Sequence, residues 1–322
     1  MVEENSLEDD KIRQLVREQY AKVALKQPEG SSCCGPSATT ETPSMSCCGP
    51  TETAENPTQS SCGSNACSPI ILPADKIEGF REKYSAKLGY TEDDLNNIPE
   101  GANLALGCGN PTAHASIQEG ETVLDLGAGG GLDCFIAANK VGKTGKVIGV
   151  DMTSQMVDRA RENARKGNYD NIDFRLGEIE NLPVANDSVD LIISNCVINL
   201  SPNKERVFNE AFRVLKPGGR VMVSDIVLLK ELPDEIKENT EAYTGCISGA
   251  IMKDQYLGLI KKAGFQDVEI MEENSYSTID FLLDDPTFKA TLEEQGRNIE
   301  EMRKLDEYIY NASIKVKAIK PN

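Results

Sequence analysis

Short apolar runs alternate with amphipathic stretches through the middle of the chain. The apolar runs are VLDLG, KVIGVD, IDFRLG, VDLIISN and RVMVSDI. Between them apolar residues recur at helical spacing, which predicts helices over 131–141, 153–166 and 203–215. Such an alternation is typical of a mostly parallel sheet with helices on both faces. We therefore expect an α/β fold with a doubly wound sheet.

The two ends of the chain carry other patterns. Between Lys11 and Ala24 the apolar residues follow helical spacing, which predicts a short amphipathic packing helix. A helix near residue 75 and a short helix started by Thr91 are expected to open the main domain. The final ASIKVKAIK alternates and predicts an edge strand, and EEQGRNIEEMRKLDEYIY before it is helix-like.

Residues 27–69 are rich in Ser, Thr, Pro, Gly and Cys and hold almost no large apolar side chain. Such a segment buries too little surface to offset its ordering entropy, so we expect disorder unless a ligand orders it. The predicted organisation is a helix (1–26), a flexible Cys-rich tether (27–74), an α/β domain (75–230) and a C-terminal α+β part (231–322).

Composition narrows the classes of function. The chain has 322 residues, with 34 Lys+Arg against 52 Asp+Glu and a formal charge of −18. This charge repels nucleic acid and anionic lipid, so we expect no nucleic-acid or membrane partner. The acidic start MVEENSLEDD has no apolar stretch behind it, and no segment reaches the roughly 18 apolar residues of a membrane span. A soluble cytoplasmic protein is therefore expected.

Ten cysteines in a reducing compartment point to soft-metal or redox chemistry before structural disulfides. The tether carries six of them in SSCCGP, MSCCGP and SSCGSNAC. A low-complexity linker and a string of capture thiols for thiophilic ions are equally good interpretations of that segment. The candidate capture thiols are Cys33, Cys34, Cys47, Cys48, Cys62 and Cys67.

A glycine-rich loop, GAGGG, follows the run VLDL. Its glycines allow a tight turn and close approach to a ligand, and the next helix offers free N–H groups. Asp125 precedes the loop, where a carboxylate would face an ammonium group and repel a pyrophosphate, which disfavours NAD. Asp151 stands where doubly wound folds bind a ribose diol, and Met152 can pack on an adenine ring. Glu178 follows the next strand.

These features resemble the class I S-adenosylmethionine-dependent methyltransferases over about residues 120–230. Another nucleotide-binding α/β domain is the alternative, because glycine loops are shared among such folds. The resemblance implies a Rossmann-like sheet of the seven-stranded type in the 75–230 domain, with S-adenosyl-L-methionine as cofactor.

Three cysteines of the main domain fall at loops or strand ends. Cys108 lies in a Gly-rich loop before the first strand, Cys196 follows Asn195, and Cys246 lies in a small-residue loop. Ligands bind outside the carboxyl ends of the strands in such sheets, so these thiols could converge above the cofactor. Three thiolates without a nearby histidine suit a trigonal thiophilic centre better than the tetrahedral site of structural zinc.

The combination LGCGNP, VLDLGAGGGLDC, VIGVDMT, SNCVINL and GCISGA closely resembles the arsenite S-adenosylmethionine methyltransferases over most of residues 75–270. The resemblance implies an enzyme that methylates As(III), giving methylarsenicals in arsenic detoxification. It implies that Cys108, Cys196 and Cys246 bind As(III) as the catalytic thiols, with Cys246 in an arsenic-site loop. The cofactor pocket would comprise Asp125, Gly127, Gly129, Gly131, Asp151, Met152, Glu178, Ile179 and Asn195.

The chemistry of this centre is mostly positioning. As(III) held by three thiolates keeps a lone pair and can attack a methyl group without a general base, so the only histidine, His114, needs no catalytic role. Methyl transfer formally oxidises arsenic, so a protein thiol pair can reduce it by forming a disulfide. Thioredoxin or glutathione would then reset the enzyme by thiol exchange.

Some positions depart from the family or stay open. Cys134 is interpreted as a small buried apolar residue. The family often carries a further cysteine about one helix before the ALGCG loop, but KIEGFREKYSA stands there without one, so the resemblance implies Cys62 or Cys67 of the tether as the substitute disulfide partner. Leu106 stands where the family places an aromatic residue. Two alternatives remain: a methyltransferase acting on a small carbon or nitrogen acceptor, and a thiophilic-metal-binding protein in which the tether binds the metal.

Overall fold

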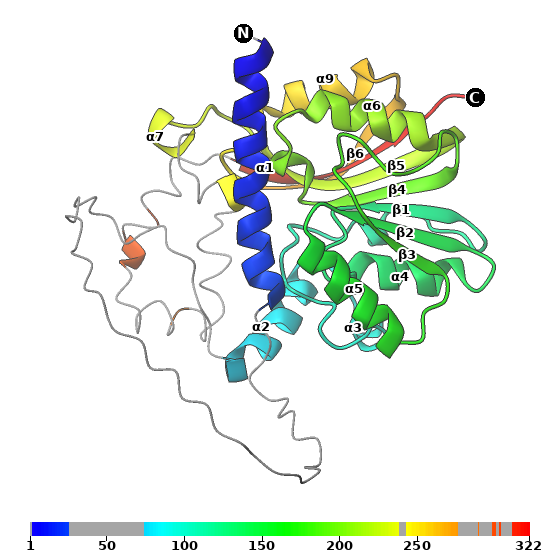
Figure 1. The fold of residues 1–322 in the computed structure, drawn as a ribbon. Helices are drawn as coiled ribbons and strands as arrows, with labels where there is room; N and C mark the ends of the chain where they lie inside the picture. The colour runs from blue at the N-terminus through cyan, green and yellow to red at the C-terminus, as the bar shows by residue number, and fades with distance from the viewer. Residues whose placement is uncertain are drawn as a thin grey trace, which may run out of the picture.

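A seven-stranded sheet forms the centre of the computed structural model (Figure 1). The structure describes residues 2–25, 74–237, 243–275, 289, 298–300, 303 and 311–322. The strand order is β3-β2-β1-β4-β5-β7-β6, in which β1 to β5 run parallel and β7 is antiparallel to both of its neighbours. The strands are β1 (Thr122–Leu126), β2 (Lys146–Asp151), β3 (Ile172–Leu176), β4 (Val189–Asn195), β5 (Leu215–Leu228), β6 (Gln266–Asn274) and β7 (Asn311–Ile319).

Helices cover both faces of this sheet, as the alternation of apolar runs and helical stretches predicts (Figure 1). Helices α4 (Leu132–Val141) and α5 (Ser154–Lys166) pack on one face, and α6 (Lys204–Val214) and α9 (Lys253–Lys262) on the other. Successive residues of a strand serve the two cores in turn. In β4, Leu191 and Ile193 belong to the first core and Ile192 to the second.

The remaining helical elements lie outside these two layers. Thr91 starts α3 as expected, because its side chain accepts a hydrogen bond from the backbone N–H of Asp94. The predicted helix at 11–24 is part of α1 (Val2–Leu25), which runs along one end of the sheet (Figure 1). The elements are α1 (Val2–Leu25), α2 (Ala74–Lys87), α3 (Glu92–Asn96), η1 (Pro111–Ala113), η2 (Ile198–Leu200) and α7 (Asp234–Lys237).

The prediction that the last strand is an edge strand is wrong. β7 lies between β5 and β6, and β6 is the edge of the sheet. Lys315 and Lys317 suggest an exposed strand, but Lys315 is buried and its ammonium group forms an ion pair with Glu272 of β6. From the sequence alone, a lysine whose ammonium group reaches a carboxylate on the next strand cannot be distinguished from a lysine that faces solvent.

Two expectations fall partly or wholly outside the described residues. The tether with its six cysteines lies outside them, and so does most of the helix-like stretch at 293–310. Among the helices that the structure does describe, none combines the length and the apolar character that crossing a bilayer requires.

The strand order predicts unequal effects of one substitution at two isoleucines. Ile314 of β7 is fully buried and Ile270 of β6 is 37% exposed. Ile314→Ala should lower the free energy of unfolding by about 2–5 kcal/mol, because it leaves a cavity. Ile270→Ala should cost less than about 1 kcal/mol. Urea unfolding of both variants tests this, and equal losses would contradict the strand order.

Candidate functional site

A pocket opens at the carboxyl ends of β1, β2 and β4. Its empty volume, including the part open to solvent, is about 960 Å³. Seven of the nine residues predicted for the cofactor line it: Asp125, Gly127, Gly129, Asp151, Met152, Ile179 and Asn195.

The glycine loop is held against the end of β2. Gly127 and Gly129 both have positive φ, at 72° and 52°. A Cβ on Gly127 would lie 2.4 Å from Val197, so no other residue fits there without a shift. The N–H of Gly129 donates to Asp151 Oδ2 at 3.0 Å, and the N–H of Thr153 donates to Oδ1 at 2.8 Å. Asp151 is thereby fixed as an oriented acceptor at the pocket wall, which fits a diol ligand.

Two predicted cofactor residues do not line the pocket. A Cβ on Gly131 would lie 2.6 Å from Phe135, so this glycine faces the core at the start of α4. The carboxylate of Glu178 forms an ion pair with Arg17 of α1. Glu180 lines the pocket instead and accepts a hydrogen bond from Ser201 Oγ at 2.7 Å. The roles of Gly131 and Glu178 remain predictions.

A buried acidic pair lines the same pocket. Asp133, which sequence reasoning missed, accepts hydrogen bonds from Tyr90 Oη at 2.8 Å and Asn195 Nδ2 at 3.1 Å. Asp125 accepts a hydrogen bond from Cys134 Sγ at 3.2 Å. Burial raises the pKa of Asp125 well above its ordinary range and that of Asp133 to about 6. A cationic group bound between the two carboxyl groups would stabilise their ionised forms, whereas a pyrophosphate would not.

The side-chain amide of Asn195 connects this pocket to the Cys108 loop. Its Oδ1 accepts the N–H of Cys108 at 3.1 Å, and its Nδ2 donates to the carbonyl of Gly109 at 2.8 Å. A Cβ on Gly107 would lie 2.5 Å from Asn195 Nδ2, which explains a glycine at that position. Asn195 therefore fixes the loop relative to the acidic pair.

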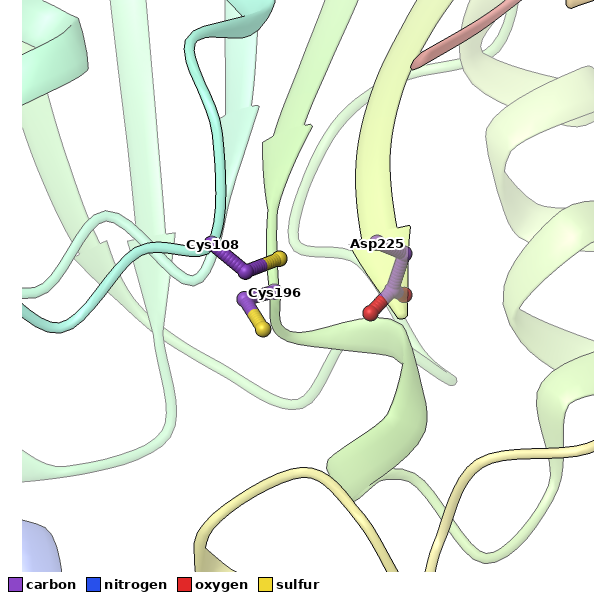
Figure 2. Close-up of side chains that lie close together, drawn as sticks. All are labelled: Cys108, Cys196 and Asp225. Carbon is purple, nitrogen blue, oxygen red and sulfur yellow. The ribbon is translucent and has the colours of Figure 1, made fainter. Parts of the chain in front are cut away.

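The structure brings the three predicted thiols together. Cys108, Cys196 and Cys246 are all buried in one cluster, at 6%, 6% and 3% exposure. Cys108 Sγ, Cys196 Sγ and a carboxylate oxygen of Asp225 lie within 4.8 Å of one another, on three separate segments (Figure 2). Cys246 Sγ is 3.0 Å from the carbonyl oxygen of Cys196.

Two of these cysteines have a left-handed backbone. The φ angle is 57° at Cys196 and 63° at Cys246. This conformation is rare outside glycine and costs on the order of 1 kcal/mol or more, and such strain gathers at functional sites. The turn in the backbone brings both residues into one cluster from two different loops.

The thiols are protonated at neutral pH. Burial raises the pKa of Cys108, and hydrogen bonding to a neighbouring thiol together with burial raises the pKa values of Cys196 and Cys246 well above the ordinary range. Three neutral thiols avoid the mutual repulsion that three buried thiolates would impose. Binding of a ligand must therefore remove their protons.

Asp225 and Lys204 are charged neighbours of the cluster that sequence reasoning missed. Asp225 is fully buried and accepts hydrogen bonds from Asn199 Nδ2 at 2.8 Å and Tyr256 Oη at 3.0 Å. Burial raises its pKa to about 7 and lowers the pKa of Lys204 to about 8. Because the Asp225 oxygens are already engaged, we describe it as a neighbour of the thiols and not as a ligand.

The remaining candidates lie apart from the thiol cluster. Cys134 is part of α4 and is buried in the core between this helix and the sheet, as its interpretation as a small apolar residue requires, and its thiol donates to Asp125. His114 Nε2 lies 3.1 Å from Glu272 Oε2, at the end of η1. Leu106 lines the pocket and is 40% exposed.

Comparison with known proteins identifies the family of this chain. Residues 117–264 match the family model described as a methyltransferase domain. The crystal structure of an arsenic(III) S-adenosylmethionine methyltransferase from Chlamydomonas reinhardtii is 32% identical, covers 74% of this chain and 73% of its own, and superposes with a TM-score of 0.52. This chain belongs to the arsenic(III) S-adenosylmethionine methyltransferase family.

Curated members of the family extend the comparison. The arsenite methyltransferase of Halobacterium salinarum is 43% identical over 261 residues, which are 81% of this chain and 59% of that protein. The human arsenite methyltransferase is 38% identical over 161 residues, 47% of this chain and 43% of that protein. The chain thus spans about half the length of these curated relatives.

The raised pKa of Asp225 predicts that the free energy of unfolding depends on pH. Between its ordinary pKa of 3.8 and its folded value of about 7, the folded chain keeps a proton that the unfolded chain has lost. The free energy of unfolding should therefore fall as pH rises from about 4 to about 7 and level off above. Asp225→Asn removes this titratable group, so its free energy of unfolding should not show this fall. Between pH 5 and pH 8 the free energy of unfolding of the variant should therefore rise by a few kcal/mol relative to that of the wild type.

Urea unfolding of the wild type and of Asp225→Asn at pH 5 and pH 8 measures this shift. Lys204 titrates at the upper end of this range, because its pKa is lowered to about 8, and loss of Asp225 would lower that pKa further, which adds to the shift in the same direction. Asp234→Asn, at an exposed aspartate, is the control. A difference between wild type and Asp225→Asn that is the same at both pH values would contradict the assignment.

Proposed function

We propose that this chain is an arsenite methyltransferase, which transfers the methyl group of S-adenosylmethionine to thiolate-bound As(III) and gives methylarsenicals. One observation carries the proposal: Cys196 lines the pocket of the methyltransferase domain and also belongs to the cluster of three buried thiols. Cofactor and substrate sites therefore share a wall, as a direct transfer of a methyl group between them requires.

The pocket residues fit the cofactor. Asp151 is oriented toward a ribose diol by two backbone N–H groups, and Asp125 and Asp133 offer carboxyl groups to an ammonium group. Met152 and Ile179 supply apolar surface for the adenine ring. When bound, S-adenosylmethionine supplies an electrophilic methyl carbon.

The thiols both bind and activate arsenic. Arsenous acid, As(OH)₃, condenses with three thiols to give three As–S bonds and three water molecules, so the thiol protons leave in the water. Thiolate-bound As(III) keeps a lone pair and is itself the nucleophile, so the site needs no general base. The thiols, through their fixed positions, hold arsenic beside the pocket.

Turnover requires a reductant. Formation of the As–C bond oxidises arsenic formally to As(V), and two thiols return two electrons by forming a disulfide. A dithiol or glutathione then reduces the disulfide by exchange, so we propose thioredoxin or glutathione as the reducing partner and a cytoplasmic location. The six tether thiols, which lie outside the described residues, are proposed to capture As(III) for the core site.

Arsenic speciation tests the proposed function. The full chain is incubated with arsenite, S-adenosylmethionine and a thiol reductant, beside Cys108→Ser, Cys196→Ser and Cys246→Ser. We expect methylarsenicals with the wild type and a loss of about 100-fold or more with Cys196→Ser or Cys246→Ser, because arsenic is no longer held in position.

Two controls make this test decisive. Each variant should still bind S-adenosylmethionine, because the cysteines are not its proposed ligands, and Cys134→Ser, which keeps a donor for Asp125, should retain methylation. If the wild type binds S-adenosylmethionine but forms no methylated arsenic, the substrate assignment is wrong, and a small carbon or nitrogen acceptor takes its place.

A further inference from the structure

A buried tyrosine stands behind the acidic wall of the pocket. Tyr90 belongs to the segment between α2 and α3 and is 4% exposed. Its ring packs in one cluster with Leu88 and with Ile136 of α4. Its backbone N–H donates to the carbonyl oxygen of Ser85, near the end of α2, at 3.1 Å. The tyrosine is therefore held by α2 and α4, with its hydroxyl group against Asp133.

The hydroxyl group of Tyr90 joins two polar residues of the pocket wall. It donates to Asp133 Oδ1 at 2.8 Å and accepts from Asn195 Nδ2 at 2.9 Å. Asp133 and Asn195 line the pocket, and Tyr90 contacts them from the protein side. Burial raises the pKa of the Tyr90 hydroxyl group well above its ordinary range, so this group keeps its proton and stays a donor at neutral pH.

Hydrogen bonds decide which carboxyl group of the acidic pair carries the charge. Asp133 accepts from Tyr90 and from Asn195, at 2.8 and 3.1 Å. Asp125 accepts from the thiol of Cys134, which is a weaker donor. Asp133 also lies in the first turn of α4, where the helix dipole favours negative charge. Because donors stabilise the ionised form, Asp133 ionises before Asp125.

The other charged groups around Asp133 leave this order in place. Lys140 of α4 lowers the pKa of Asp133, and Asp94 of α3 raises it. Lys140 Nζ and Asp94 Oδ1 lie 3.8 Å apart, so their effects on Asp133 oppose each other. Burial raises the pKa of Asp133 to about 6, and the hydrogen bonds from Tyr90 and Asn195 act against this rise.

We propose that Tyr90 is a positioning residue of the cofactor site, whose hydroxyl group keeps the Asp133 carboxyl group ionised and directed at the ammonium group of S-adenosylmethionine. This rests on the proposed function, in which Asp133 offers its carboxyl group to that ammonium group. It goes beyond it, because it assigns part of the site to a side chain behind the pocket wall, in a segment that precedes the matched domain at 117–264.

Binding of two ligands to the full chain tests the proposal without arsenic or methyl transfer. S-adenosylmethionine carries the ammonium group, whereas 5′-methylthioadenosine has the adenine and ribose parts but no amino acid part. Dissociation constants are measured for the wild type and Tyr90→Phe at pH 5.5 and pH 7.5, on either side of the Asp133 pKa of about 6. For S-adenosylmethionine, the ratio of the variant constant to the wild-type constant should be about fivefold larger at pH 5.5.

The sign of this effect follows from the lost donor. Without the Tyr90 hydroxyl group the pKa of Asp133 rises, so at pH 5.5 binding must remove a proton that is held more tightly. At pH 7.5 Asp133 is mostly ionised in both proteins. The ratio of the two constants cancels the titration of the ligand itself. 5′-Methylthioadenosine should bind both proteins equally at both pH values, which also shows that the variant is folded.

Tyr169→Phe is the matched control, because it removes a tyrosine hydroxyl group that donates to the carbonyl oxygen of Asn97 at 2.8 Å, away from the pocket. It should keep the wild-type constants at both pH values. Asp133→Asn is a second background, which removes the titrating group. In that background Tyr90→Phe should change the affinity for S-adenosylmethionine by the same factor at pH 5.5 and pH 7.5.

The outcomes separate this inference from the proposed function. A ratio that is the same at both pH values, or a pH effect that persists in the Asp133→Asn background, would show that Tyr90 does not act through the charge of Asp133. Equal weakening of both ligands would show a structural role alone and also overturn the inference. A wild type that binds S-adenosylmethionine but forms no methylated arsenic would contradict the proposed function and leave the role of Tyr90 intact.

Discussion

The side-chain amide of Asn195 is the interaction on which the two halves of the site depend. It accepts the N–H of Cys108 and donates to Tyr90 and Asp133, so one residue at the end of β4 links the thiol cluster to the acidic wall of the pocket. Transfer of a methyl group between two bound partners needs reacting atoms held at a fixed separation. Loss of this amide would remove the two hydrogen bonds that join the Cys108 loop to the end of β4.

Burial is the second constraint, and it shapes the chemistry of the cluster. The thiols lie beneath α1, next to Asp225, which is itself held by Asn199 and Tyr256. In this setting thiols stay protonated until a ligand exchanges their protons for bonds to sulfur. A thiophilic ligand that leaves water as its by-product fits such a site better than a hard cation, which requires preformed negative charge. Val16 of α1 covers this cluster with an apolar side chain.

Sequence patterns predict the parts of the structure that are local. The alternation of apolar runs with helical stretches predicts the parallel sheet. The glycine loop with Asp125 and Asp151 predicts most of the pocket. Both predictions succeed because each pattern lies within one strand–loop–helix unit. The grouping of three cysteines follows from the rule that strand ends meet at one edge of the sheet.

The failures of prediction all involve partners that are distant in sequence. An alternating pattern predicts β7 as an edge strand, because it does not show that Lys315 forms an ion pair with Glu272 on the next strand. Asp225 reads as an ordinary polar residue in a strand until Tyr256 and the thiols surround it. α1 packs on the domain as predicted, but nothing in its spacing shows that Val16 lies against cysteines that follow by about 90 residues or more.

The most direct measurement is arsenic K-edge X-ray absorption of the reduced full chain loaded with one equivalent of arsenite. We expect three sulfur neighbours around arsenic, both in the wild type and in a variant in which the six tether cysteines are serine. We also expect Cys196→Ser in that background to lose a sulfur neighbour. If arsenic keeps three sulfur neighbours in Cys196→Ser, or loses them when only the tether cysteines are replaced, the thiol cluster is not the arsenic site.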